Sequence, residues 1–276
     1  MSTPAPTNPL SSSQPWNWVA EAYVENTMPL LGLFGEVAIE RAAIGPTMRV
    51  VDVATGPGTV ACRVATKVAS VHAVDFSSEM VACCRARVDA LGLRNVTMTQ
   101  GDGQALPYAD ASFDLGFSMF GLMFFPDRPR GFRELCRVLR PGGRAFVTSW
   151  ASVEKSPLML ARIAAWKATD PSAPLPQKNV MTLENPEVFA HEMAAAGFED
   201  VSVEPVYRDR EFRDVDELCD GATHGNALLE IARREIGEKE WGRRMPIMRD
   251  YLGKNYGPFP LRLGSTAYLG QGRKPG

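Results

Sequence analysis

The chain has 276 residues, with 30 lysines and arginines against 32 aspartates and glutamates, so its formal net charge at pH 7 is −2. This length allows one α/β domain with a sizeable core and an added cap, and the near-neutral charge does not favour a polyphosphate partner such as nucleic acid. No window has the length of a transmembrane span, and the N-terminus lacks a charged-then-apolar signal pattern, so we expect a cytoplasmic protein without a membrane partner.

The cysteines predict no structural metal. The chain has five of them, with no C-x-x-C pairing and no His-Cys cluster of metal-ligand spacing. That usage is typical of a reducing compartment. Cys83 and Cys84 are neighbours on a predicted helix, and we interpret them as packing residues.

The N-terminal part divides into two segments. Residues 1–15 are rich in Ser, Thr and Pro, which predicts a disordered N-terminus. Residues 16–45 predict two helices separated near Pro29. Apolar residues within the second of these helices give it one broad packing face.

The stretch 48–58 reads Met-Arg-Val-Val-Asp-Val-Ala-Thr-Gly-Pro-Gly. Its three valines, interrupted by Asp52, indicate a central strand that is buried on both faces. Gly56 and Gly58 then allow close backbone approaches, and a helix is predicted over 59–69. A strand, a glycine turn and a helix start place several backbone N–H groups at the carboxyl edge of a sheet, where a ligand can bind.

The same loop also satisfies the loose dinucleotide fingerprint Gly-x-Gly-x-x-Ala, and an ordinary tight βα turn is the alternative interpretation. The next strand, 71–75, ends in Asp75, whose carboxylate is placed to accept both hydroxyls of a ribose. Asp75 can also serve as the N-cap of the helix that begins near Ser77, and the two roles are compatible.

Strands and helices alternate through the middle of the chain. The predicted core elements are a strand at 48–53, a helix at 59–69, a strand at 71–75, a helix at 77–91, strands at 95–100 and 113–118, a helix at 127–139 and a strand at 143–150. This alternation predicts a parallel sheet with helices on both faces.

Beyond residue 150 the alternation of strands and helices becomes less regular. Helices are predicted over 156–169 and 185–197, a strand over 201–206, and a final strand over 261–271. We interpret residues 207–257 as a helical insertion, or cap, between the last two strands. The core then spans 46–206, and residues 258–276 return to it as the final strand and tail.

Five motifs occur in a fixed order: Asp-x-Ala-x-Gly-x-Gly at 52–58, Val-Asp-Phe-Ser-x-x-Met at 74–80, Gly-Asp-Gly at 101–103, Phe-Asp at 113–114 and Leu-Arg-Pro-Gly-Gly at 139–143. This series resembles the class I S-adenosylmethionine-dependent methyltransferases, particularly the small-molecule branch that includes the ubiquinone/menaquinone-biosynthesis C-methyltransferases. The resemblance covers roughly residues 46–150. It implies a Rossmann-like α/β fold with a mainly parallel seven-stranded sheet, helices on both faces, a helical cap, and S-adenosyl-L-methionine as cofactor.

The resemblance also implies where the cofactor binds. The expected cofactor-binding residues are Tyr23, Asp52, Ala54, Gly56, Gly58, Asp75, Phe76, Met80, Asp102, Gly103 and Ser118. The loop from Ala54 to Gly58 would face the methionine part, with Asp52 orienting the loop or the amine. Ala54 occupies the position of the first glycine of the family's loop motif, so the sequence departs from the family pattern there.

Further roles follow from the same resemblance. Asp75 would bind the ribose, Phe76 would pack on the adenine edge, and Asp102 and Gly103 would hydrogen-bond the adenine. A solvated turn aspartate is the alternative for Asp102. Tyr23 would lie by the methionine carboxylate, with docking of its own helix as the alternative. The helices over 16–45 and the cap over 207–257 are expected to cover the methyl end of the cofactor.

The fourth strand predicts the acceptor side. Met119, Phe120 and Phe124 fall at its carboxyl edge, where ligands bind in open α/β sheets, so we expect an apolar or aromatic small-molecule acceptor. A buried strand end is also expected to be apolar without any ligand. The Asn/Asp-Pro-Pro-aromatic tetrad of amino-methylating nucleic-acid enzymes is missing, as is a Pro-Cys nucleophile, so nucleic acid is not the expected substrate.

Three histidines are present, and His224 in the insertion is the candidate general base, with an ordinary loop histidine as the alternative. The methylated atom stays open between O, N and C, and the assembly is expected to be a monomer or homodimer. Two other functions remain as alternatives. One is an NAD(P)-dependent oxidoreductase, and the other is a catalytically silent S-adenosylmethionine-binding subunit.

Overall fold

The computed structural model describes residues 8–172 and 183–276. Its strands are β1 (Arg49–Val53), β2 (Ser70–Asp75), β3 (Val96–Gln100), β4 (Phe113–Met119), β5 (Leu139–Trp150), β6 (Glu199–Phe212) and β7 (Leu261–Arg273). They form one seven-stranded sheet in the order β3-β2-β1-β4-β5-β7-β6. Pairing is parallel from β3 to β5, whereas β7 runs antiparallel to both β5 and β6.

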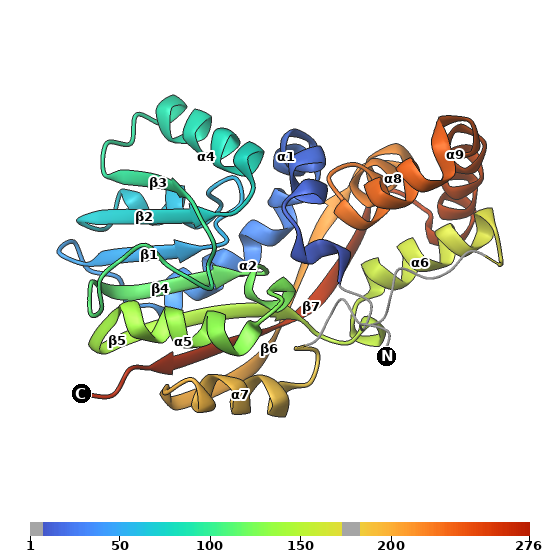
Figure 1. Cartoon of the computed structure of the whole chain (residues 1–276). Coiled ribbons are helices and arrows are strands. Elements are labelled where there is room, and N and C mark those ends of the chain that lie inside the picture. Colours follow the sequence, from blue (N-terminus) through green and yellow to red (C-terminus); the bar gives the residue numbers. More distant parts are fainter. Residues whose placement is uncertain (1–7, 173–182) are drawn as a thin grey trace, which may run out of the picture.

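Helices flank the sheet and extend beyond it (Figure 1). The α-helices are α1 (Gln14–Asn26), α2 (Met28–Arg41), α3 (Ala61–Ala65), α4 (Ser78–Ala90), α5 (Arg128–Val138), α6 (Pro157–Thr169), α7 (Pro186–Ala195), α8 (Val215–Thr223) and α9 (Ala227–Tyr256). Short 3₁₀ turns are η1 (Pro9–Ser11), η2 (Leu122–Phe124) and η3 (Val153–Lys155). The predicted Rossmann-like α/β class, with its mainly parallel sheet, is therefore confirmed.

The central strands owe their position to their apolar runs. Residues 50–53 of β1 and residues 113–118 of β4 are buried throughout, because helices cover both faces of a parallel sheet. Phe117 of β4 packs on Phe146 of β5, with ring centroids 5.6 Å apart. The carboxyl ends of β1, β2 and β4 meet at one edge of this rigid layer.

The N-terminus differs from the expectation of disorder through residue 15. Leu10 in η1 is only 3% exposed, and the Ser11 hydroxyl donates to the Phe124 carbonyl at 2.8 Å. These contacts fix residues 8–15 although their composition is poor in apolar residues. Residues 1–7 of the predicted disordered segment lie outside the described residues.

Other boundaries shift modestly. The helix predicted over 59–69 is the shorter α3, and β6 continues to Phe212, into the range predicted as insertion. Helices α8 and α9, which we call the cap, fill most of the remainder. Within α9, Gly237 has φ of 80° and interrupts the helical backbone. In the part of the chain that the structure describes, no helix is both long and apolar enough to span a membrane.

Candidate active site

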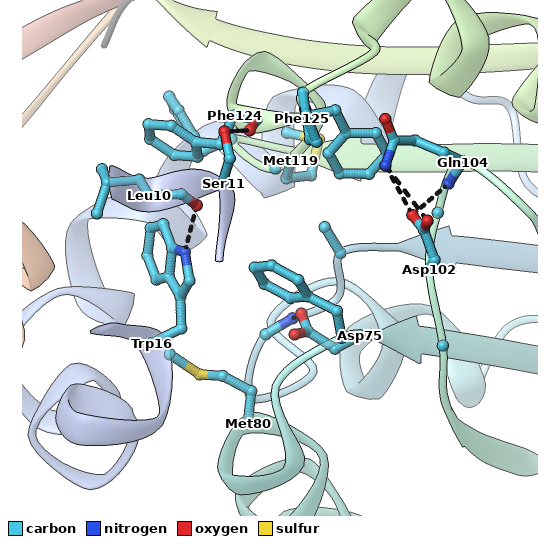
Figure 2. Close-up of a pocket in the computed structure, with 18 of the residues that line it drawn as sticks. Leu10, Ser11, Trp16, Asp75, Met80, Asp102, Gln104, Met119, Phe124 and Phe125 are labelled. Atoms are coloured by element: carbon cyan, nitrogen blue, oxygen red, sulfur yellow. Dashed lines mark hydrogen bonds between the residues drawn. The ribbon is translucent and has the colours of Figure 1, made fainter. Parts of the chain in front are cut away.

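A cavity of about 340 Å³ lies at the carboxyl ends of β1, β2 and β4 (Figure 2). This volume falls within the range of roughly 300–1,000 Å³ that is usual for small-molecule sites. The predicted residues that line it are Tyr23, Ala54, Gly56, Asp75, Phe76, Met80, Asp102, Gly103, Met119, Phe120 and Phe124. A second cavity of about 30 Å³ shares several of these residues and adds Asp52. The sheet edge thus gathers most of the residues that the motifs singled out.

Asp52 fixes the loop that follows β1. Its Oδ2 accepts from the Thr55 hydroxyl at 2.7 Å and from the Ala61 backbone N–H at 3.1 Å. The side chain is buried, and this burial raises the pKa of Asp52 to about 7. Asp52 therefore ties the start of the loop to the first turn of α3.

Ala54 and Gly121 explain how the loop tolerates the departure from glycine. Ala54 has φ of 55°, in the left-handed region that favours glycine. A Cβ placed on Gly121 would lie 2.2 Å from the Ala54 Cβ. The methyl group of Ala54 thus occupies space that the facing residue leaves empty, and only glycine at position 121 fits.

The two loop glycines have different tasks. Gly56 lines both cavities, and its N–H donates to Asp75 Oδ2 at 2.8 Å. Gly58 lines neither cavity. It has φ of 76°, and a Cβ there would lie 2.3 Å from the Cys84 sulfur of α4. Gly58 thus lets the loop pack against a helix, which differs from its expected place beside the cofactor.

Asp75 connects the first two strand ends. Besides the bond from Gly56, its Oδ1 accepts from the Ser77 N–H at 2.9 Å. The N-cap of α4 is Ser77, whose hydroxyl accepts from the Met80 N–H, so the capping role considered for Asp75 belongs to its neighbour. Burial raises the pKa of Asp75 to about 6. Burial and the nearby Asp75 carboxylate also raise the pKa of Tyr23.

The loop after β3 forms the other polar side of the cavity. The Asp102 carboxylate accepts from the Gln104 backbone N–H at 2.8 Å and from its side-chain amide at 3.0 Å. This is a local turn of the kind considered as the alternative, and the exposed carboxylate nevertheless lines the cavity. Gly103 allows a close approach, because a Cβ there would lie 2.5 Å from the Phe125 ring.

Three apolar residues, Met119, Phe120 and Phe124, line the cavity, and we call them the wall. Phe120 has φ of 60°, which is unfavourable for a bulky residue. Its N–H donates to Thr148 Oγ1 at 3.0 Å, and its ring centroid lies 4.3 Å from that of Trp150. The surrounding contacts therefore hold Phe120 in a strained conformation at the cavity edge.

The N-terminal segment completes the cavity. The Trp16 ring lies 5.3 Å from that of Phe124, and the Trp16 indole N–H donates to the Leu10 carbonyl at 2.9 Å. Figure 2 shows Leu10, Ser11 and Trp16 grouped beside Phe124. Lining residues that were not among the expected site residues are Leu10, Ser11, Trp16, Gly101, Gln104, Gly121, Phe125 and Pro126. A lone leucine in a Ser- and Pro-rich stretch was the only available signal for Leu10.

Besides Gly58, two predicted site residues are not brought to either cavity. Ser118 is fully buried within β4, and its hydroxyl has no hydrogen-bond partner among the described residues. His224 follows α8 and is exposed, with Nδ1 3.4 Å from Oδ1 of Asp220. Across residues 8–172 and 183–276, no three His, Cys, Asp or Glu side chains are grouped to hold a metal ion.

Comparison with known proteins assigns the family. Residues 50–143 match the family model described as a methyltransferase domain. The uncharacterized protein Rv1405c of Mycobacterium tuberculosis is 34% identical over 244 residues, which cover 87% of this chain and 76% of that protein. The ubiquinone/menaquinone biosynthesis C-methyltransferase UbiE of Geotalea daltonii is 34% identical over 119 residues, covering 42% of this chain and 51% of that enzyme.

The chain belongs to the class I S-adenosylmethionine-dependent methyltransferases. Its predicted family, enzyme class and cofactor are therefore confirmed. The YcgJ protein of Bacillus subtilis shares the fold, with a TM-score of 0.58, 19% identity and coverage of 88% of this chain and 98% of that one. This assignment replaces the alternative of an NAD(P)-dependent oxidoreductase. The polar groups at the strand ends suit S-adenosylmethionine, the cofactor of this family.

Proposed function

We propose that this methyltransferase moves a methyl group in line from S-adenosylmethionine to a small apolar or aromatic acceptor. The supporting observation is the division of the cavity. Asp75 and Asp102 lie on one side, and Met119 and Phe124 lie across from Asp75 (Figure 2). Polar groups are thus available for the cofactor, and apolar groups are available beside it.

The polar side supplies the groups that the cofactor needs. In the proposal, Asp75 accepts both ribose hydroxyls, since a carboxylate has about four acceptor sites and backbone N–H groups use two. The bound hydroxyls favour the ionised form, so the pKa of Asp75 falls on binding. Asp102 and Gly103 bind the adenine, with Phe76 at its edge. Tyr23 and the loop at Gly56 hold the methionine part.

The apolar side of the cavity would position the acceptor and exclude water. Direct transfer needs the acceptor atom in line with the methyl group, about 3–3.5 Å away, and it is faster when water is excluded. The phenyl rings of Phe120 and Phe124 have no hydrogen-bonding atoms, and the Met119 sulfur accepts from the Thr148 hydroxyl at 3.9 Å. The wall therefore selects acceptors mainly by shape and apolar surface. His224 lies outside both cavities, and in this proposal it is a surface residue without a catalytic role.

Calorimetry and transfer of a labelled methyl group test the proposal together. The wild type should bind S-adenosylmethionine and not NAD, and it should label small phenols, thiols or amines in preference to polar metabolites of equal size. Phe120→Ala should lower turnover by roughly 10-fold or more with little change in cofactor affinity, because it removes only acceptor positioning. Leu91→Ala, on an exposed side chain, is the matched control. Turnover unchanged by Phe120→Ala would place the acceptor elsewhere.

A further inference from the structure

The carboxylate of Asp102 lies on a loop that gives it little support of its own. The loop after β3 reads Gly101-Asp102-Gly103, so a glycine flanks the aspartate on each side. Glycine restricts the backbone less than any other residue. Asp102 is exposed to solvent, and it also lines the cavity. A side chain in this position rotates away from a ligand unless another group holds it.

Gln104 holds this carboxylate with its backbone and with its side chain. The Gln104 backbone N–H donates to Asp102 Oδ1 at 2.8 Å, and the side-chain amide donates to the same oxygen at 3.0 Å (Figure 2). The amide nitrogen lies 3.3 Å from the second oxygen, Oδ2. A carboxylate has about four acceptor sites. Oδ1 is thus occupied twice, whereas Oδ2 has only the longer bond and is available to a donor in the cavity.

The orientation of the Gln104 amide follows from its two partners. On its other side, Gln104 Oε1 accepts from the Asp127 backbone N–H at 2.7 Å. A backbone N–H only donates, and an ionised carboxylate only accepts. The amide oxygen therefore faces Asp127, and the NH₂ group faces Asp102. Glutamate at this position would not make the same bridge, because an ionised carboxylate has no proton to donate.

Asp127 is a fixed partner because it begins a helix. It is the N-cap residue of α5, and its side chain accepts from the Arg130 N–H at 3.0 Å. A second bond joins the same loop to the same helix, since the Leu106 N–H donates to Glu134 Oε2 at 2.8 Å. Gln104 thus connects an exposed carboxylate to a helix terminus that is itself held in place.

Phe125 packs the loop against α5 beside this network. A Cβ on Gly103 would lie 2.5 Å from the Phe125 ring, and a Cβ on Gly131 of α5 would also lie 2.5 Å from it. The ring is therefore enclosed between two glycines, one on each element. Gly103, Gln104 and Phe125 all line the cavity. The bonded pair of Asp102 and Gln104 thus lies at the part of the cavity that the proposed function assigns to the adenine.

We propose that Gln104 is a positioning residue for the cofactor, which holds the Asp102 carboxylate so that Oδ2 accepts from the 6-amino group of adenine. This inference rests on the proposed function, which assigns the adenine to Asp102 and Gly103. Gln104 acts through Asp102, because its amide oxygen and its amide donors face Asp127 and Asp102. Since the carboxylate is held before the ligand arrives, binding does not have to restrict its rotation.

The experiment compares two ligands, S-adenosylhomocysteine and its purine analogue, which lacks only the 6-amino group. Calorimetry on the full wild-type chain should give the adenine form roughly 10-fold tighter binding or more, as expected for a charge-assisted hydrogen bond. Gln104→Met keeps the length of the side chain without its amide, and the affinity ratio should fall to about 3-fold or less. Gln271→Met is the matched control, because this β7 glutamine bonds to Ser202 and lines neither cavity.

A double-mutant cycle separates positioning from direct contact. Asp102→Ala alone should remove the preference for the amino group. Adding Gln104→Met to Asp102→Ala should change the ratio no further, since Gln104 acts through the carboxylate. Gln104→Glu should lower the ratio at least as much as Gln104→Met, because two neighbouring carboxylates repel each other.

Three outcomes would overturn the inference. An unchanged ratio in Gln104→Met would do so, and a lower melting temperature beside it would assign Gln104 a structural role. A preference that survives in Asp102→Ala and disappears only when Gln104→Met is added would assign the bond to Gln104 itself. Equal affinity of the wild type for the two ligands would remove the amino group from Asp102. Failure of the wild type to bind S-adenosylhomocysteine would instead contradict the proposed function.

Discussion

The two halves of the sheet are stabilised by different means. In the cofactor half, strands β1 to β4 are joined in parallel, and the site consists of the loops that follow them. In the cap half, β6 and β7 pair antiparallel, α6 packs against β7, α8 packs against β6, and α9 packs against these two helices. The central strands of the first half are almost wholly buried, whereas β6 of the second is mostly exposed or half-buried. The cofactor half therefore depends mainly on the backbone conformation of its loops. The cap half depends mainly on contacts between side chains.

The energetics follow this division. In the cofactor half, fixed apolar contacts leave little room, as the 2.2 Å approach between a Gly121 Cβ and Ala54 illustrates. In the cap half, ion pairs such as Arg249–Asp216 are more than half exposed, and such pairs typically contribute about 0–1 kcal/mol each. We therefore expect single substitutions to be most damaging in the cofactor half.

Gly121→Ala should have the largest effect. The added methyl group meets the Ala54 Cβ, and overpacking of this kind costs about 3 kcal/mol in free energy of unfolding, with a comparable loss of cofactor affinity. Ala54→Gly in the same chain should restore most of both, because it removes the facing methyl group and the strain at φ of 55°. Urea denaturation and calorimetry of the four-member cycle measure this coupling. Additive effects of the two changes would refute it.

Asp75→Ala should have the second largest effect. Loss of the carboxylate removes the bonds from Gly56 and Ser77 and the proposed bonds to the ribose, so S-adenosylmethionine affinity should fall by about 2 kcal/mol. Calorimetric titration gives the value. Glu79→Ala, in the first turn of α4, is a nearby acidic control that lines neither cavity. Unchanged affinity in Asp75→Ala would remove this residue from the cofactor site.

The stability of the cofactor-free protein should decrease as pH rises from about 4 to about 7. The pKa of Asp52 is 3.8 in the unfolded reference and about 7 in the folded protein, so the folded state binds more protons in this range. Asp75, with a folded pKa of about 6, acts in the same direction. Asp52→Asn should reduce the decline between pH 5 and pH 8 by about 1 kcal/mol or more. Urea denaturation at several pH values tests this, and an identical slope in the variant would contradict it.

His224→Ala should have the smallest effect. The side chain is exposed and lies outside both cavities, and its pairing with Asp220 is exposed as well. Turnover and cofactor affinity should stay within about 2-fold of the wild type. A fall of roughly 10²-fold in turnover with unchanged cofactor affinity would instead identify His224 as a general base, as one sequence interpretation proposes.

The same division limits what the sequence can predict. Strand ends in the cofactor half carry their chemistry in local motifs, so Asp75, Asp102 and Gly56 could be placed at the cavity from periodicity and family resemblance. The partner of Ala54 could not, because Gly121 comes near it only after β4 has paired with β1. Gly58 illustrates the same limit, since its close neighbour is a sulfur of α4.

Long-range contacts also explain the N-terminus. Composition alone predicts disorder through residue 15, whereas Ser11 bonds to Phe124, which is 113 residues away in the chain. A few such contacts are enough to order residues 8–15, and no window of local sequence contains them.

The ends of the cap have an evolutionary consequence. Phe212, the last residue of β6, pairs directly with Leu261, the first residue of β7, so the chain leaves and re-enters the sheet at neighbouring positions. A short reverse turn can join such residues at little entropic cost. Whole insertions can therefore be exchanged at this junction while the sheet and its cofactor loops stay intact. The cap is thus one contiguous piece of sequence whose replacement would leave the strand pairing of the sheet in place.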